Sequence, residues 1–404
     1  MADVLFTPLR LRNVTLPNRL VRSATYEGWG DPQGMPRAGL TDMYLELARG
    51  GVGTIVSGFV FTEWQGRAMH PGQCGIDDDA KVEPWRKVIG PVLERHPETR
   101  LFMQIAHTGR QTLRRVTGMS VVGASPRKCT YFRQRVSELD AAAIARIASG
   151  FGDAARRAKE AGFHGVQVHA AHGYLIHQFL SPWTNIRKDR WADRPLFLEE
   201  VVRAVQERCG PGYPVLVKLS GADDRGLTLA DTRSTVRRLE ALGVDAVEIS
   251  YGTMEYALNI IRGACPVDLV LDINPLFNRI PRLLRALWRL CLKKSYLKNF
   301  LAFQENYNRD AAVTVKRDTG LPVIMVGGLR TAEAIRESVE RYGLDAVAMC
   351  RPLLCEPDLP KRLQAGEFVK SRCTNCNLCT IHCDGPGPTF CHTRKERHGR
   401  AEDV

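Results

Sequence analysis

The sequence predicts an α/β protein, a (β/α)8 barrel with a helical insertion between strands six and seven and a cysteine-rich C-terminal extension. The main observation is a repeated phrase, a glycine followed by small apolar and β-branched residues. It occurs as GVGTIVSG, GFHGVQVH, GVDAVEIS and GLDAVAMC, beginning at Gly51, Gly162, Gly243 and Gly343. Each phrase follows a helix-like run, as a buried parallel strand preceded by a helix C-cap would.

Other strand and helix candidates complete the pattern. Similar short apolar runs occupy residues 19–25, 100–107, 213–220 and 322–328, and helical runs occupy residues 139–161, 196–209, 229–242 and 331–342. About eight strands alternating with helices favour a closed barrel, with a doubly wound open sheet as the alternative. We expect the barrel to occupy residues 1–365, with the insertion at about 265–303, and the cysteine-rich segment to occupy residues 366–404.

Composition excludes several classes of protein. Of the 404 residues, 44% are hydrophobic and 25% are charged, which is typical of a globular chain. No apolar run approaches the roughly 20 residues that cross a bilayer, and the N-terminus lacks the features of a signal peptide. The 12 cysteines lack the spacing of a secreted disulfide scaffold. We therefore expect a cytoplasmic protein, and one that forms homo-oligomers.

The net charge of +13 is concentrated in the insertion. Residues 273–304 contain no acidic residue, and their cations are Arg279, Arg282, Arg285, Arg289, Lys293, Lys294 and Lys298. Leucines at 283, 287 and 290 share one helical face and the cations another, which predicts an amphipathic helix. Three roles are open for this helix. It could present a solvated face over the barrel, make a peripheral contact with anionic lipid, or form a lid that attracts an acidic ligand such as an acyl-CoA. We prefer the lid, and we expect no nucleic-acid partner.

Polar residues follow the predicted strands, where a barrel places its chemistry. In chain order they are Thr25, Tyr26, Gly58, Gln104, His107, His169, His172, Lys218, Gly327, Gly328 and Arg351. Two glycines followed by Thr331 as a helix N-cap favour a phosphate there, with Arg351 as a bidentate partner, although a plain turn would use the same residues. No GxGxxG fingerprint follows any strand, so a nicotinamide bound in the Rossmann manner is not expected.

The stretch HAAHGYLIHQFLSP, beginning at His169, carries the strongest chemical signal. His169 and His172 could bind a metal, but no acidic third ligand accompanies them within the motif. Neutral imidazoles can equally donate hydrogen bonds to a developing oxyanion. Two histidines and Tyr174 at a strand end favour chemistry over packing, whereas His177 is interpreted as structural.

This stretch, with Asn185, Arg187 and Asp189 downstream, resembles the signature of the old yellow enzyme family, which are flavin-dependent ene-reductases on a (β/α)8 barrel. The segments LFTPLRLRNVTLPNRLVRSAT, HTGR, VGG and RPLLCEPDLP also match, in order, over about residues 4–364. After Asp189 the family's glutamate-tyrosine-glycine-glycine is replaced by RWAD, so the rim of the substrate pocket is not predicted.

The resemblance implies a bound FMN. Its phosphate would lie at Gly327, Gly328 and Arg351, its pyrimidine edge at Gln104, and the backbone around Ser23, Ala24 and Thr25 would flank the ring. Gly58 is placed in the same site, and Cys350 replaces the glycine usual before the arginine. Lys218 stands where the family usually has arginine, so its positive charge would stabilise the anionic reduced flavin.

The resemblance also implies the reaction. NAD(P)H would transfer a hydride to the flavin and leave, and N5 would then deliver it to the β-carbon of an α,β-unsaturated carbonyl compound in a ping-pong cycle. His169 and His172 would hold the carbonyl oxygen, and Tyr174 would protonate the α-carbon. Tyr26 would line the same pocket and tune its shape or the flavin potential.

Five cysteines are packed into CTNCNLCTIHCDGPGPTFC, beginning at Cys373. Closely spaced CxxC units predict a metal or cluster site. The segment is similar to the one that follows the barrel in dienoyl-CoA reductases, which implies a [4Fe–4S] cluster on Cys373, Cys376, Cys379 and Cys391, with Cys383 as a competing ligand. The spacing to the third cysteine is one residue shorter here, so a zinc site or a remnant is an alternative.

Three functions therefore compete. The first is an FMN-dependent oxidoreductase that reduces activated alkenes with NAD(P)H. The second is an iron–sulfur flavoprotein of the dienoyl- or enoyl-CoA reductase type that takes electrons from a separate partner. The third is a flavin-free barrel that binds a membrane or nucleic acid through its basic helix.

Overall fold

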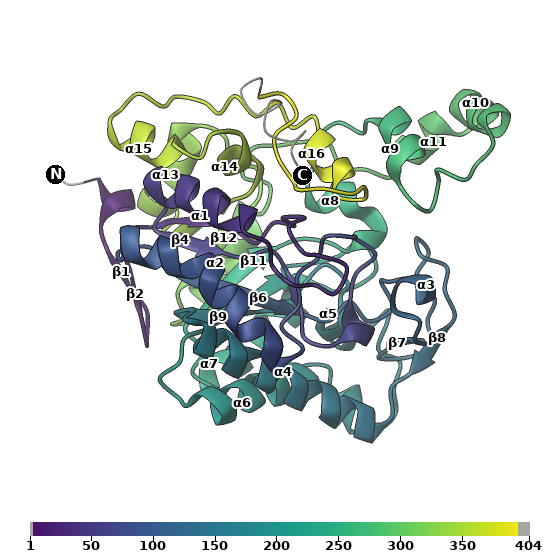
Figure 1. Ribbon diagram of the computed structural model, residues 1–404, viewed down its shortest axis with the longest axis horizontal. Coiled ribbons are helices and arrows are strands. Elements are labelled where there is room, and N and C mark those ends of the chain that lie inside the picture. Colours follow the sequence, from purple (N-terminus) through teal and green to yellow (C-terminus); the bar gives the residue numbers. More distant parts are fainter. Residues whose placement is uncertain (1–2, 395–404) are drawn as a thin grey trace.

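A closed barrel of parallel strands forms the centre of the computed structural model, which describes residues 3–394 (Figure 1). Each strand pairs with the next, and the last strand pairs with the first. Each of the eight predicted strand runs overlaps one of these strands, so the closed barrel is confirmed over the open sheet. The strands are β3 (Leu20–Arg22), β4 (Thr54–Val56), β6 (Arg100–Ala106), β9 (Gly165–Ala170), β10 (Val215–Ser220), β11 (Ala246–Ser250), β12 (Val323–Val326) and β13 (Ala346–Met349).

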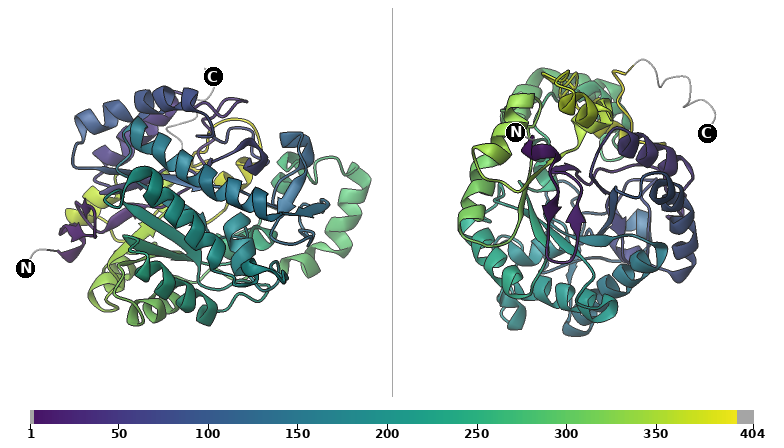
Figure 2. Two further views of the ribbon diagram at one scale, coloured as in Figure 1. Left: turned by 90° about the horizontal axis from the view of Figure 1, so that it is seen from below. Right: turned by 90° about the vertical axis from the view of Figure 1, so that its left-hand side faces the viewer.

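Helices surround the barrel, as the two views of Figure 2 show. They are α1 (Gly39–Arg49), α2 (Val82–Arg95), α4 (Ala141–Ala161), α6 (Leu196–Cys209), α7 (Leu229–Ala241), α12 (Arg309–Arg317), α13 (Ala332–Glu340), α14 (Arg351–Cys355) and α15 (Leu359–Gln364). The longest, α4, begins where Asp140 accepts a hydrogen bond from the Ala143 N–H (2.8 Å) and ends at Gly162, whose φ is 104°. Both ends follow the usual chemistry of helix caps.

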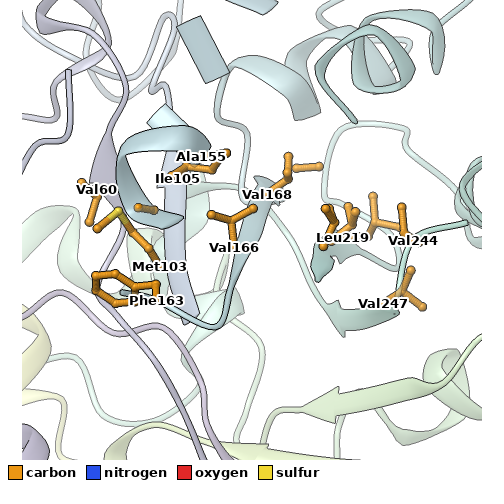
Figure 3. Close-up of a cluster of buried hydrophobic side chains, with 14 of the residues drawn as sticks. Val60, Met103, Ile105, Ala155, Phe163, Val166, Val168, Leu219, Val244 and Val247 are labelled. Carbon is orange, nitrogen blue, oxygen red and sulfur yellow. The ribbon is translucent and has the colours of Figure 1, made fainter. Parts of the chain in front are cut away.

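Alternation along the strands separates an apolar shell from a polar interior. Met103 and Ile105 of β6 and Val166 and Val168 of β9 pack outward against the helices, with Ala155 of α4 among their neighbours (Figure 3). The residues between them, Gln104 and Gln167, therefore face the barrel axis. Lys218 and Glu248 have the same position in β10 and β11, where valines, leucine and isoleucine flank them.

The N-terminal end of the barrel is closed by a small hairpin of β1 (Leu9–Arg10) and β2 (Thr15–Leu16). Leu9, Leu11 and Leu16 pack in one cluster with Phe102 and Leu216, which lie near the starts of their strands. Because this end is filled with apolar side chains, only the C-terminal end is left to hold polar chemistry.

Two additions lie at the C-terminal end of the barrel. The predicted insertion forms α9 (Val267–Ile273), α10 (Arg282–Cys291) and α11 (Lys293–Leu297) between β11 and β12. These helices project from one side of the barrel in Figure 1. The cysteine-rich segment carries α16 (Leu378–His382), which contacts α9. Within residues 3–394, no helix has both the length and the hydropathy needed to cross a membrane.

Gly152 of α4 allows α4 and α6 to approach closely. A Cβ at Gly152 would lie 2.6 Å from the backbone oxygen of Ala204, whereas a Cβ at Gly150 on the same helix would meet nothing within 4 Å. We expect Gly152→Ala to lower the free energy of unfolding by ~1–3 kcal/mol, because a backbone oxygen must move. The matched variant Gly150→Ala should raise it by up to about 1 kcal/mol through helix propensity alone. Urea unfolding of both variants checks this, and an equal effect at the two sites would contradict it.

Candidate functional site

A cavity of about 900 Å³ opens at the C-terminal end of the barrel. Ten of the residues predicted to bind flavin or substrate line it: Ala24, Thr25, Tyr26, Gln104, His169, His172, Tyr174, Lys218, Cys350 and Arg351. Ser23, Gly58, Gly327 and Gly328 are not among the lining residues. The strand ends therefore bring together most of the predicted site, from residues more than 300 positions apart in the chain.

A hydrogen-bonded network of buried side chains forms the floor of this cavity. Strand register places Gln104 beside Gln167, and Lys218 beside both His169 and Glu248. The Gln104 amide donates to Gln167 (2.7 Å), and the Gln167 amide donates to the Glu248 carboxylate (2.8 Å). Lys218 Nζ lies 2.9 Å from Glu248 Oε1, and the hydroxyl of Ser23 donates to the same oxygen at 2.5 Å.

Glu248 is the residue that this network depends on, and it was missed in the sequence. It is fully buried and accepts hydrogen bonds or ion-pair contacts from Ser23, Gln167 and Lys218. A buried carboxylate is tolerated only when its oxygens are satisfied in this way. The available signal was a carboxylate in the middle of the otherwise apolar strand AVEIS. The ion pair of Lys218 with Glu248 leaves the floor of the cavity close to neutral in charge.

His169 and His172 lie at one wall, with their ring centroids 5.1 Å apart and their planes at 89°. His169 Nδ1 accepts the Ala171 N–H (3.3 Å), which leaves Nε2 as the protonated nitrogen. His172 Nε2 bonds the Ser250 hydroxyl (2.8 Å), and its backbone has a φ of 60°, held by an N–H bond to Ser220 Oγ. A left-handed non-glycine residue fixed by its surroundings is typical of a functional site.

Burial sets the charge of these groups. The pKa of His169 lies well below its usual value because the ring is desolvated and faces the Lys218 charge. The pKa of His172 is lowered likewise by desolvation, then by His169 and Lys218. The pKa of Tyr174, whose ring lies 4.8 Å from that of His169, is raised by desolvation and by the charge of Asp384. The wall therefore presents two neutral imidazoles and a protonated phenol near pH 7.

The residues predicted to bind the phosphate contact other side chains and backbone groups of this protein. A Cβ at Gly327 would lie 2.6 Å from the side chains of both Asn308 and Tyr307, so these side chains cover the glycine turn. Arg351 lines the cavity, and its guanidinium donates to Asn377 Oδ1 (2.5 Å) and to the Arg262 carbonyl (3.0 Å). Arg351 is therefore hydrogen-bonded to other residues of the chain, and the glycine turn is covered by them.

The rim of the cavity joins three segments that are distant in sequence. Asp384 of the cysteine-rich segment lies 3.4 Å from His70 Nδ1, and its other carboxylate oxygen accepts from Asn274 of the insertion (2.6 Å). Asn274 also bonds the hydroxyl of Tyr131 (2.7 Å). The insertion therefore does lie over the site, as the predicted lid would, and the C-terminal segment shares that position. Sequence reasoning missed the rim because no local pattern links these residues.

Gln111 is a second missed residue. It lines the cavity, is 1% exposed, and both its side-chain oxygen and nitrogen lack a hydrogen-bond partner in the described part of the chain. Buried polar atoms are normally satisfied, so this amide is suited to a polar group of a ligand.

The predicted metal ligands fall into two groups. Cys373 and Cys391 pack with Cys355, a cysteine outside the predicted set. Cys379 and Cys383 line the cavity instead, and Cys383 Sγ contacts the hydroxyl of Thr389 (3.4 Å). Burial raises the pKa of Cys379 to about 11 and that of Cys383 to about 12. In this arrangement, residues 3–394 bring no three His, Cys, Asp or Glu side chains into metal-binding geometry.

Comparison with known proteins gives consistent matches. The chain is 29% identical over 388 residues to an NADH oxidase of Thermoanaerobacter brockii, covering 94% of this chain and 53% of that protein. It is 35% identical over 367 residues to an NADPH dehydrogenase of Geobacillus thermodenitrificans, covering 89% and 93%. The chain thus spans about half the length of the first of these relatives and nearly all of the second.

Solved structures and a family model agree with these matches. An old yellow enzyme homologue from Zymomonas mobilis superposes with a TM-score of 0.70 at 22% identity, covering 91% of this chain and 94% of that one. The model of the NADH:flavin oxidoreductase / NADH oxidase family matches residues 4–268. With the closed barrel and the residues gathered at its C-terminal end, these matches show that the chain belongs to this family, that of the old yellow enzymes.

Proposed function

We propose that this protein is an FMN-dependent oxidoreductase that uses NAD(P)H to reduce the C=C bond of α,β-unsaturated carbonyl compounds. The observation that carries the proposal is the juxtaposition of two neutral imidazoles and a protonated phenol over a floor of amide and ammonium donors. An enone needs hydrogen-bond donors at its oxygen and an acid at its α-carbon. The cavity supplies both within one wall.

The residues present fit an FMN. The cavity has the size of pockets that hold ligands of this class, and it offers an amide at Gln104 and an ammonium at Lys218 for a pyrimidine edge. Gln111 supplies buried polar atoms that need a ligand partner. FMN bound there would accept a hydride from NAD(P)H and deliver it from N5 to the β-carbon in a ping-pong cycle.

The floor residues would hold and tune the cofactor. Lys218 would donate to the pyrimidine edge while Glu248 keeps its ammonium in place from below. Because Glu248 balances the lysine charge, the net positive field on the ring is smaller than an unpaired cation would give. The backbone at Ser23, Ala24, Thr25 and Cys350 would flank the ring, with Gly58 behind it, since a Cβ at Gly58 would lie 2.8 Å from the Thr25 carbonyl oxygen.

The phosphate would bind at Arg351 with the backbone N–H groups of Gly327 and Gly328. This requires Arg351 to exchange its bonds to Asn377 and the Arg262 carbonyl for phosphate oxygens. It also requires Tyr307 and Asn308 to move from the glycine turn.

The wall residues would act on the substrate. His169 Nε2 and His172 Nδ1 have no partner among the described residues, so both can donate to a carbonyl oxygen. Tyr174 holds its proton and would give it to the α-carbon. Tyr26 would shape the pocket beside His70, since the two ring centroids lie 4.9 Å apart.

The cysteine-rich segment favours a second candidate, an iron–sulfur flavoprotein that takes electrons from a separate partner. Cys373, Cys376, Cys379 and Cys391 would hold a [4Fe–4S] cluster, or a zinc ion in a purely structural site. Thiolates are the right donors for either, and Cys373 and Cys391 already lie in one cluster. Since the pKa of Cys379 is raised, binding would have to displace its proton. Cys383 is the competing ligand, and both it and Cys379 line the cavity.

Anaerobic stopped-flow spectroscopy tests the first proposal. The FMN-loaded protein should bleach when mixed with NADH or NADPH and regain its flavin absorption when mixed with an enone such as cyclohexenone. Reduction by neither nucleotide, but by dithionite, followed by reoxidation with the enone, would favour the second candidate. A protein that does not bind FMN contradicts both.

The wall histidines should make stability depend on pH. Their native pKa values lie below the unfolded value of about 6.5, so below that pH the unfolded state binds more protons and folding weakens as pH falls. Below about pH 6.5 each histidine should cost up to about 1.4 kcal/mol per pH unit, the full slope being reached once the unfolded imidazole is protonated. Urea unfolding of His169→Asn/His172→Asn should show a shallower loss than the wild type. Parallel slopes for the double variant and the wild type would show that the imidazoles are not buried neutral.

Tyr174→Phe removes the proposed acid and keeps the ring. We expect the rate of enone reduction to fall about 100-fold or more, because the α-carbon loses its proton donor. Reduction by NAD(P)H and reoxidation by ferricyanide, neither of which protonates a substrate carbon, should change little. Stopped-flow traces of the three reactions check this, and an equal loss in all three would point to a structural role for Tyr174.

A further inference from the structure

The helices of the insertion carry an exposed apolar face. Of the ten large apolar side chains that are strongly exposed among residues 3–394, seven lie within residues 283–301. On α10 itself Leu283 is 87% exposed, Leu287 56% and Leu290 85%. These three positions share one side of a helix, so the leucines form one continuous stripe with Leu284 beside it.

The opposite side of α10 holds the helix to the protein. Arg285 pairs with Asp272 (2.8 Å) and Arg289 pairs with Asp268 (2.7 Å), both acids on α9. Arg285 and Trp288 also line the cavity. The helix is therefore oriented with its arginine side inward and its leucine side outward, the reverse of a helix that covers a soluble core. A lid over the cavity, as predicted from the sequence, does not explain why the leucines face outward.

Cations flank the apolar stripe. Arg279 and Arg282 precede it and Lys293, Lys294 and Lys298 follow it; all five are exposed and form no ion pair within the described chain. The acids nearest in sequence, Asp268 and Asp272, already pair with Arg289 and Arg285. Exposed leucines between unpaired cations are the features of a helix that lies in the interface of an anionic membrane.

We propose that α10 and α11 dock this protein on an anionic lipid surface, with the leucine stripe among the acyl chains and the flanking cations at the headgroups. Charge complementarity selects this occupant over a second copy of the chain. A twofold pairing of α10 with itself, parallel or antiparallel, would place cations of one copy against cations of the other, because cations lie at both ends of the stripe. The proposal does not depend on the reaction in the cavity.

Vesicle binding tests the docking with the full FMN-loaded chain. Sedimentation with phosphatidylcholine vesicles that contain phosphatidylglycerol should capture the protein, and added salt should weaken the capture. Vesicles of phosphatidylcholine alone should bind it about tenfold less. The same anionic vesicles should protect the chain from trypsin at Arg282, Lys293 and Lys294.

Two sets of variants separate the contributions. Leu283→Ser/Leu287→Ser/Leu290→Ser should lower capture about tenfold or more through lost apolar burial, and Lys293→Gln/Lys294→Gln/Lys298→Gln should lower it about tenfold through lost charge. The control Ile186→Ser/Val369→Ser replaces apolar residues that are also exposed, outside the insertion, and should leave capture unchanged. All these residues lie at the surface, and circular dichroism verifies that each variant is folded.

Three results would overturn the proposal. The first is no capture of the wild type by anionic vesicles. The second is capture that the leucine or the lysine variants do not change. The third is light scattering that shows a dimer which the leucine variant dissociates, without vesicle binding, because the face would then join two copies of the chain.

Discussion

The carboxylate of Glu248 lies inside the barrel and away from water. The floor of the cavity depends on the side chains that compensate this buried charge. Lys218, Ser23 and Gln167 all point at it, and Gln104 is held in turn by Gln167. Removing any one partner would leave a buried charge only partly compensated. The arrangement therefore fixes the two floor donors, Gln104 and Lys218, before any ligand arrives, which reduces the reorganisation that binding requires.

Closure of the barrel places the histidine wall and the rim of the cavity around this floor. Parallel strands place all their C-terminal ends at one mouth, so His169 and His172 come to lie beside Lys218. The other end is filled by the leucines of the N-terminal hairpin. Loops then build the rim, where Asp384 joins His70 to Asn274 of the insertion. The insertion thus lines the cavity on its inner side and exposes leucines on its outer side.

The barrel could be predicted from the sequence because its strands repeat one phrase, and each repeat ends in residues that the mouth brings together. Gln104, His169 and Lys218 were found in this way, since their strand-end positions are a local property. Glu248 was missed because its role depends on neighbours in β9 and β10 and on Ser23, directly after β3. The rim was missed because it joins residues 70, 274 and 384, and the outward orientation of Leu283 was missed because the amphipathic pattern does not say which face meets the protein. The covering of Gly327 by Tyr307 is likewise a tertiary contact.

A crystal structure of the protein with FMN tests the central claim most directly. We expect the flavin in the barrel mouth, its pyrimidine edge on Gln104 and Lys218, and Glu248 still bonded to Lys218 beneath it. A flavin bound elsewhere, or a mouth in which Lys218 has left Glu248 and turned away from the ring, would contradict the account.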